Sequence, residues 1–296
     1  MNNGIHKPDL PLRLAFLLLK MFLISPFGVG LMAVGRKYLT PDDNDWVEVT
    51  RIPLRLPRLS PVFEGYRLVQ ISDFHIGTWA DRARLLEAVG RVNGLNPDLI
   101  AITGDFVTHD PEKYESDLVQ ILSTLSASDG CVAVLGNHDH WSDPKVVRRI
   151  LRRSGIVELK NSIYPIRRGS ETLSIAGVDD IMEDLDDLPA VVKRLPDDRA
   201  AILLAHEPDF ADESALGGHF DLQLSGHTHG GQVHFPRIGP VVLPRFGKKY
   251  PCGLYNVNGM HLYTNRGLGT AEIQFRYHCP AEISLFELHT QDFDRF

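Results

Sequence analysis

The sequence predicts an α/β fold, and three observations carry that prediction. Short apolar runs typical of buried strands alternate along the chain with segments of helical spacing. After five of these runs, the next residues include Asp, Asn or His. The 296 residues are 43% hydrophobic and 23% charged, an ordinary globular composition that supports a sizeable core. One large domain or two small ones would fit this length.

The expected elements follow one another from residue 67 to residue 229. Buried strands are predicted where an apolar run is short and bounded by polar or turn residues. They are "RLVQIS" (67–72), "DLIAITGD" (98–105), "CVAVLGNHDH" (131–140), "LSIAGVDD" (173–180), "AAILLAHEPDF" (200–210) and "FDLQLSGHTH" (220–229). Helices are predicted where apolar residues share one face, or where a segment starts with Pro and stops at Gly. They cover 81–95, 115–125 and 144–155.

Segments outside this alternation are of two kinds. The polar, turn-rich "TPDDNDW" (40–46) predicts a linker. Near the other end, "GMHLYTNRG" (259–267) and "AEISLFELH" (281–289) alternate apolar and polar residues, which predicts antiparallel strands.

The first forty residues form a hydrophobic segment unlike the rest of the chain. Between Leu14 and Gly35 the only charge is Lys20, and the length is near that of a membrane span. Because Lys20 and Pro26 weaken an ideal span, a signal-anchor helix, an interfacial helix and a cleaved export signal all remain open. A retained membrane anchor is favoured over a helix docked on the domain, because the segment is almost continuously apolar.

Basic residues flank this segment on both sides, so the positive-inside rule leaves its orientation open. Scarce cysteine favours a cytoplasmic domain, whereas an export-type start favours the other side. Cys131, Cys252 and Cys279 form no CxxC pair, which excludes a disulfide framework and a zinc-thiolate site. The net charge of -7 argues against a nucleic-acid polymer as partner.

Polar groups gather at the predicted strand ends. They are Asp73-Phe74-His75, Gly104-Asp105, Gly136-Asn137-His138-Asp139, Ala205-His206-Glu207 and Gly226-His227-Thr228-His229. Since open α/β sheets bind ligands outside the carboxyl ends of their strands, these groups are expected along one edge. Carboxylate, imidazole and amide oxygen without thiolate suit Mn, Fe or Zn. The donors are too many for one tetrahedral ion, whereas two ions sharing a carboxylate would serve phosphoryl transfer.

Each of these residues has an ordinary explanation when taken alone. Asp73 would be a turn or helix cap, Asn137 a turn former and His206 a satisfied core histidine. Only their joint occurrence at strand ends favours a site. The glycines at 104, 136 and 226 are expected to let the backbone turn sharply into it. Asp139 could orient His138, but this pairing is not favoured, because adjacent residues on a turn need not face each other.

The ordered series D-x-H, G-D, G-N-H-D, H and G-H-x-H over residues 73–229 resembles the calcineurin-like metallophosphoesterase superfamily. The resemblance implies a four-layer α/β/β/α sandwich of two mixed β-sheets flanked by helices, over residues 65–290. Residues 1–40 would then be the N-terminal hydrophobic helix, and 41–64 a linker and lead-in strand. The resemblance also implies metal roles: Asp73, His75 and His229 for one ion, Asn137, His206 and His227 for the other, and Asp105 as the bridge. His138 would lie beside the ions, facing the substrate phosphate.

Further motifs resemble the YaeI- or YkuE-like, membrane-associated bacterial subgroup. They are the N-terminal hydrophobic segment, HEPDF (206–210), GHTHGGQ (226–232) and RGLGT (266–270). The subgroup is similar to hydrolases that split the pyrophosphate of UDP-2,3-diacylglucosamine in lipid A biosynthesis, which implies a lipid-linked substrate at the bacterial inner membrane. Basic residues that could pair with its phosphates are Arg237, Arg245, Lys248, Lys249 and Arg266, with a solvated loop as an equal alternative.

The expected reaction is hydrolysis of a phosphodiester or pyrophosphate by direct attack of a hydroxide bridging two cations, which lower the pKa of bound water toward ~7. His138 would stabilise the phosphoryl oxygens or protonate the leaving oxygen, an effect of roughly 10²–10⁴-fold. One alternative is a general phosphodiesterase or phosphatase acting on nucleotides, phosphoproteins or cell-wall polymers. The other is a scaffold that binds partners without catalysis, which is disfavoured because the chain supplies every ligand.

Overall fold

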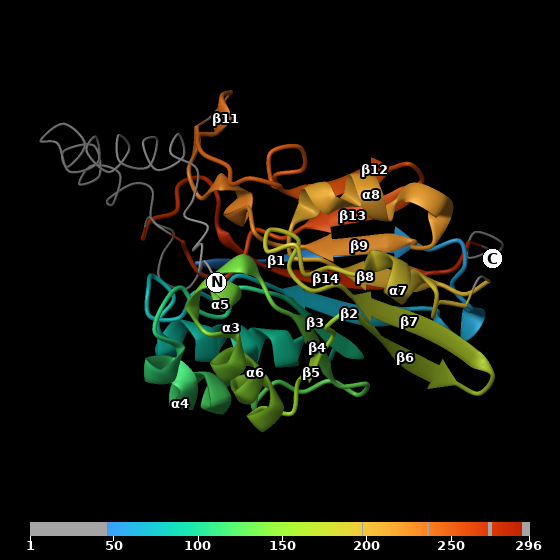
Figure 1. The fold of residues 1–296 in the computed structure, drawn as a ribbon, viewed down its shortest axis with the longest axis horizontal. Helices are drawn as coiled ribbons and strands as arrows, with labels where there is room; N and C mark the ends of the chain where they lie inside the picture. The colour runs from blue at the N-terminus through green and yellow to red at the C-terminus, as the bar shows by residue number, and fades with distance from the viewer. Residues whose placement is uncertain (1–45, 197, 236, 272–273, 292–296) are drawn as a thin grey trace, which may run out of the picture.

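Two six-stranded mixed β-sheets form the centre of the structure, a computed structural model that describes residues 46–196, 198–235, 237–271 and 274–291 (Figure 1). The first sheet has the order β1 (Val47–Arg55), β14 (Ala281–His289), β2 (Tyr66–Ile71), β3 (Leu99–Thr103), β4 (Cys131–Val134) and β5 (Val157–Glu158). The second has the order β12 (Gly253–Val257), β13 (Met260–Thr264), β9 (Leu222–Ser225), β8 (Ala201–Leu204), β7 (Glu171–Gly177) and β6 (Ser162–Arg168). A separate hairpin pairs β10 (His234–Phe235) with β11 (Gly239–Pro240).

The central strands β4 and β8 are apolar throughout, as expected for strands with both faces buried. In β3, Leu99 and Ala101 pack between the two sheets, whereas Ile100 and Ile102 pack under helices. The second sheet repeats the pattern, since Ile202 of β8 faces the inner layer and its neighbours Ala201 and Leu203 face outward. Successive side chains of a strand point to opposite faces, so each apolar run serves two cores at once.

Helices cover the outer face of each sheet. The first sheet is covered by α3 (Arg82–Gly94), α4 (Pro111–Leu122) and α6 (Pro144–Arg153), and the second by α7 (Leu188–Val192) and α8 (Ala211–Ser214) (Figure 1). Short 3₁₀ turns lie at Pro61–Phe63, Pro208–Phe210, Leu216–Gly218 and His229–Gly231. The carboxylates of Asp81 and Asp143 accept backbone N–H groups at the starts of α3 and α6, as N-caps do. The helices and the sheets therefore stack in four layers.

The last strands correct the expectation of a purely antiparallel end. β13 is antiparallel to β12 but parallel to β9, and β14 is antiparallel to β2 but parallel to β1. The full length of β1 pairs with β14, from Val47 beside Ala281 to Arg55 beside His289. Alternation along a strand shows which residues face the core but not the direction of its neighbours, so the sequence could not distinguish these pairings.

Most of the predicted N-terminal features lie outside the residues that the structure describes. The predicted hydrophobic helix of residues 1–40 and the first residues of the 41–64 segment lie outside the described residues. Within the residues that the structure describes, no helix combines the length and the apolarity needed to cross a membrane.

Candidate metal centre

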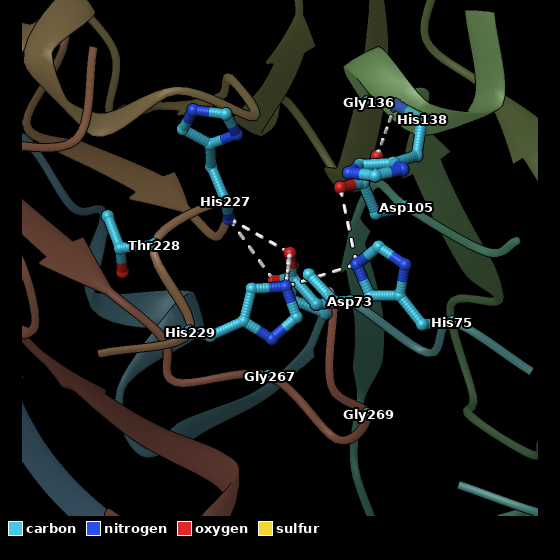
Figure 2. Close-up of polar contacts among 12 residues, drawn as sticks. Asp73, His75, Asp105, Gly136, His138, His227, Thr228, His229, Gly267 and Gly269 are labelled. Atoms are coloured by element: carbon cyan, nitrogen blue, oxygen red, sulfur yellow. Dashed lines mark hydrogen bonds and ion pairs between the residues drawn. The ribbon is translucent and has the colours of Figure 1, made fainter. Parts of the chain in front are cut away.

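The predicted metal ligands come together from the carboxyl ends of strands in both sheets. Strands β2, β3 and β4 are parallel, as are β8 and β9, so the loops that follow them open at a common edge. The side chains collected there are Asp73 and His75 after β2, Asp105 after β3, Asn137 after β4, His206 after β8, and His227 and His229 after β9. All of them are buried. Figure 2 shows imidazoles from both sheets converging on the Asp73 and Asp105 carboxylates.

The donors form two clusters, and a third group of His75, Asp105 and His138 connects them. Ligand atoms of Asp73, His75 and His229 lie within 4.8 Å of one another, and so do those of Asp105, His206 and His227. His229 Nε2 lies 3.0 Å from His75 Nε2 and 3.4 Å from Asp73 Oδ1. Asp105 Oδ2 lies 3.2 Å from His206 Nε2 and 3.5 Å from His75 Nε2. These separations match the roughly 3.0–3.6 Å expected between two donors that share one ion at bond lengths near 2.0–2.2 Å.

Backbone carbonyls fix which nitrogen of His206 and of His227 carries the proton. His206 Nδ1–H donates to the Thr103 carbonyl at 2.6 Å, and His227 Nε2–H donates to the Arg245 carbonyl at 2.8 Å. His75 Nδ1 lies 2.9 Å from Thr108 Oγ1. Partners of this kind orient metal-binding histidines and leave the lone pair of the other nitrogen free.

Two buried atoms support the fit of a cation. Asn137 Oδ1 and His206 Nε2 have no hydrogen-bond partner among the described residues. Buried polar atoms are nearly always paired, so each unpaired atom needs an explanation. A divalent cation fits this donor set, because amide oxygen, imidazole and carboxylate all offer lone pairs to it.

Burial and mutual charge set the protonation of the site. Burial lowers the pKa of His138 to about 4 and that of His227 to about 3, so both imidazoles are neutral at neutral pH. Burial opposes the charging of His206, but the Asp105 carboxylate raises the pKa of this imidazole well above its usual value. Burial also raises the pKa of Asp73. A cation would reverse both effects, because ligation requires neutral imidazole and ionised carboxylate.

Five of the predicted ligands lie in the left-handed region of backbone conformation. Their φ values run from 43° to 70°, and they are Asp73, His75, Asp105, His227 and His229. Such conformations destabilise a non-glycine residue by roughly 1–3 kcal/mol and cluster at functional sites. The motif RGLGT helps to hold one of them, because Leu268 N–H donates to the Ser72 carbonyl at 2.9 Å and Gly269 N–H to the Asp73 carbonyl at 2.6 Å.

The glycines of the site correct the expectation of three sharp turns. Gly104 has φ +96°, as a sharp turn requires, but Gly136 has φ -116° and Gly226 also lacks a positive φ. Those two are needed because neighbouring atoms approach closely. A Cβ on Gly136 would lie 2.4 Å from Asp105 Oδ1, and one on Gly226 would lie 2.4 Å from Asp73 Oδ2.

Asp139 has a role that the sequence did not indicate. Its buried carboxylate accepts N–H groups from Asp105 at 2.9 Å, Phe106 at 2.9 Å, Val107 at 3.3 Å and Gly136 at 3.1 Å. It therefore fixes the loop that carries Asp105, and its hydrogen-bond partners among the described residues are backbone N–H groups, not the His138 ring. The available signal was its position three residues after Gly136, where carboxylates often accept backbone N–H groups at a helix start.

His138 lies on α5 (Asn137–Ser142) beside both donor clusters. Its backbone N–H donates to Asp105 Oδ1 at 3.0 Å, and its ring centre lies 4.8 Å from that of His75. Its other neighbour is Trp141, with ring centres 4.9 Å apart, and the indole N–H of Trp141 donates to Glu183 at 2.8 Å. Trp141 could be found in the sequence only by its place next to the G-N-H-D-H run.

The predicted phosphate-binding cations divide into two groups. Arg266 pairs with Glu282 at 3.0 Å and Glu48 at 2.9 Å, and Lys249 pairs with Asp212 at 2.6 Å. Arg237, Arg245 and Lys248 are exposed on the segment that follows the His227–His229 loop. Among the described residues, His234 forms no hydrogen bond with a predicted metal ligand. Its Nε2 contacts the Gly230 carbonyl.

Comparison with known proteins identifies relatives over most of the chain. Residues 66–231 match the family model described as calcineurin-like phosphoesterase. The chain is 33% identical to the metallophosphoesterase YkuE of Bacillus subtilis, over 91% of this chain and 96% of that protein. It is 28% identical to the phosphodiesterase YaeI of Escherichia coli, over 91% of this chain and 98% of that protein. A transmembrane protein with metallophosphoesterase domain from Danio rerio is 30% identical over 80% of this chain and 56% of its own length.

Proposed function

The chain belongs to the calcineurin-like phosphoesterase family, and we propose that its strand-end site binds two divalent cations and hydrolyses phosphodiester or pyrophosphate bonds. The family consists of hydrolases that act on phosphoester bonds at a dinuclear metal site. The observation that carries the proposal is the position of Asp105, whose Oδ2 lies 3.2 Å from His206 Nε2 and 3.5 Å from His75 Nε2. One carboxylate thus lies within reach of both donor clusters.

The proposed ligands divide between the two ions as the clusters do. The first ion is held by Asp73, His75 and His229, the second by Asn137, His206 and His227, and Asp105 is shared. The donor types suit Mn, Fe or Zn, and availability in the cell decides among these metals.

The proposed reaction divides the chemistry between the cations and the protein. When bound, the cations supply a water of lowered pKa and Lewis-acid stabilisation of the phosphoryl oxygens. The protein supplies a buried site whose carboxylates and imidazoles are fixed before substrate arrives, so little reorganisation is needed. His138 donates a ring N–H to a phosphoryl oxygen. A bound phosphate anion would raise the pKa of this imidazole, which is the condition for protonating the leaving oxygen.

The substrate we propose is a lipid-linked pyrophosphate, with UDP-2,3-diacylglucosamine as the named candidate. Support comes from the hydrophobic segment at residues 1–40, which would hold the enzyme at the bacterial inner membrane with the catalytic domain on the cytoplasmic side. The second candidate is a general phosphodiesterase on soluble or cell-wall substrates, which the name of the relative YaeI favours. Product analysis on UDP-diacylglucosamine and on simple diesters separates the two, because only the first predicts a strong preference for the lipid nucleotide.

Metal dependence is the test of the reaction class. Protein stripped of metal should lose hydrolysis of bis-p-nitrophenyl phosphate and regain it with Mn²⁺. Asp105→Asn should reduce kcat by roughly 10³-fold or more, because a neutral amide with a single oxygen donor bridges two cations poorly. The matched control is Asp198→Asn, since the side chain of Asp198 is 82% exposed and lies away from the site. Absence of bound metal and of turnover in the parent protein would leave only a non-catalytic scaffold.

A further inference from the structure

The charge of the chain is distributed unevenly along the sequence. Residues 222–271 contain five basic residues and no Asp or Glu, whereas the remaining residues contain 26 basic and 38 acidic ones. Four of the five basic residues lie in the segment 237–249, which we call the cationic loop. A positive surface on a chain with net charge -7 suits an anionic partner.

The tip of the cationic loop is apolar and exposed. Ile238 has 79% of its surface exposed and Val241 has 45%, and Ile238 is the most exposed large hydrophobic side chain of the described residues. Ile238 lies in the turn between β10 and β11, and Figure 1 shows β11 projecting beyond the two sheets. Neighbouring exposed apolar side chains on a projecting element indicate a contact surface.

Three cations of the cationic loop have no ion-pair partner among the described residues. They are Arg237, Arg245 and Lys248, and all three are exposed. The guanidinium of Arg245 lies 4.5 Å from the Phe246 ring centre, a cation–π contact that leaves its charge available. Lys249 differs from these three, because its ammonium group pairs with Asp212 at 2.6 Å.

The cationic loop is fixed to the metal centre by hydrogen bonds. The Arg245 carbonyl accepts the His227 Nε2–H at 2.8 Å. The Asp209 carboxylate accepts the backbone N–H groups of Lys248 and Lys249, each at 3.1 Å. A surface that bound the cationic loop would therefore be held beside the metal centre.

We propose that the cationic loop docks on an anionic lipid bilayer, with Ile238 and Val241 in the acyl-chain boundary and Arg237, Arg245 and Lys248 on lipid phosphates. Exposed apolar side chains and exposed cations on one loop match the two layers of such a surface. Single-stranded nucleic acid fits less well, because its bases stack on aromatic rings and the exposed tip is aliphatic. This inference does not depend on hydrolysis, so docking and the proposed reaction can fail separately.

The test measures the depth of single positions in the full chain. The variant Ile238→Cys is labelled at the new cysteine with nitrobenzoxadiazole, a fluorophore that responds to the polarity around it. Cys131→Ser and Cys252→Ser remove the two partly exposed native thiols. The matched control is Leu216→Cys, a 64% exposed position that precedes β9 and lies at the opposite end of that strand from His227. The protein is reconstituted into phosphatidylcholine vesicles with and without phosphatidylglycerol, and acyl-chain nitroxide lipids serve as quenchers.

The expected result is a blue shift and nitroxide quenching at position 238 that depend on phosphatidylglycerol, with no change at position 216. Arg237, Arg245 and Lys248 are also replaced by Gln. Each charge removed should shift the equilibrium between the docked and the undocked loop toward the undocked state by about fivefold. A probe at 238 that stays in water in both vesicle types would overturn the proposal, and so would equal shielding at 216 and 238. If Ile238→Cys does not fold, Val241→Cys provides the same measurement.

Discussion

The metal centre and the cationic loop are neighbours that are built in opposite ways. The predicted metal ligands are buried, and five of them have left-handed backbone conformations held by surrounding hydrogen bonds. The cationic loop carries exposed side chains, three of whose charges have no ion-pair partner among the described residues. The function of the metal centre depends on the position of each ligand atom. The function of the cationic loop depends on which kinds of side chain it exposes. Substitutions should therefore have large effects in the first region and small effects in the second.

The largest effect on stability is expected at Arg266, which forms an ion pair with the buried Glu282. Its partner Glu282 is almost fully buried, so Arg266→Gln leaves the carboxylate without its cation and should reduce the free energy of unfolding by roughly 3 kcal/mol. Burial alone would raise the pKa of Glu282, but Arg266 and Tyr263 outweigh burial and lower it. Urea denaturation of both proteins measures the difference.

The stability difference between wild type and Arg266→Gln should depend on pH. A carboxylate with a lowered pKa in the folded state stabilises the protein above its unfolded pKa, and that contribution is lost as pH falls through the folded pKa. The gap between wild type and Arg266→Gln should thus be largest above about pH 5 and shrink at lower pH. A gap that does not change with pH would mean that the ion pair with Glu282 is not the cause.

The next effect is expected where the backbone approaches a ligand. A Cβ on Gly226 would lie 2.0 Å from Ser72 Oγ and 2.4 Å from Asp73 Oδ2, so Gly226→Ala should displace Asp73. A displacement near 1 Å can reduce kcat by about 10²-fold. The control is Gly90→Ala in α3, where no atom lies within 4 Å of the new Cβ and helix propensity should stabilise the protein by about 1 kcal/mol. Equal activity of both variants would contradict the close-approach account.

A smaller effect is expected at the carboxylate that holds the Asp105 loop. Asp139→Asn replaces one acceptor oxygen by a donor that faces backbone N–H groups, which should reduce the free energy of unfolding by roughly 2 kcal/mol. The activity should fall by about 10–100-fold, as for other partners that orient metal ligands. The control is Asp143→Asn, because Asn caps a helix as well as Asp does. Loss of stability without loss of activity would show that the Asp105 loop keeps its geometry unaided.

The smallest effect is expected on the cationic loop. Ile238→Ser removes a side chain that is 79% exposed, so the free energy of unfolding should change by less than about 0.5 kcal/mol. Hydrolysis of a soluble diester should not change. A loss of activity on that substrate would show that the two regions are coupled and would break the contrast between them.

The sequence predicted the chemistry of the site better than its geometry. Strand-end positions could be predicted for Asp73, Asp105 and His206, because buried strands are apolar and the first polar residues mark their ends. The left-handed conformations could not be predicted, since for a residue other than glycine they depend on contacts with distant segments such as residues 268–269.

Contacts between residues far apart in the sequence could not be predicted either. The edge position of β1 depends on its pairing with β14, more than two hundred residues later in the chain. The binding of Arg266 to Glu282 and of Lys249 to Asp212 likewise depends on the fold, so a list of basic residues could not separate paired cations from free ones. The metal roles of the ligands themselves remain a prediction.

Anomalous diffraction from crystals grown with Mn²⁺ tests the central claim most directly. The account predicts two manganese peaks, one among Asp73, His75 and His229 and one among Asn137, His206 and His227, with the Asp105 carboxylate bound to both. A single peak, or peaks away from these side chains, would contradict a dinuclear centre at the strand ends.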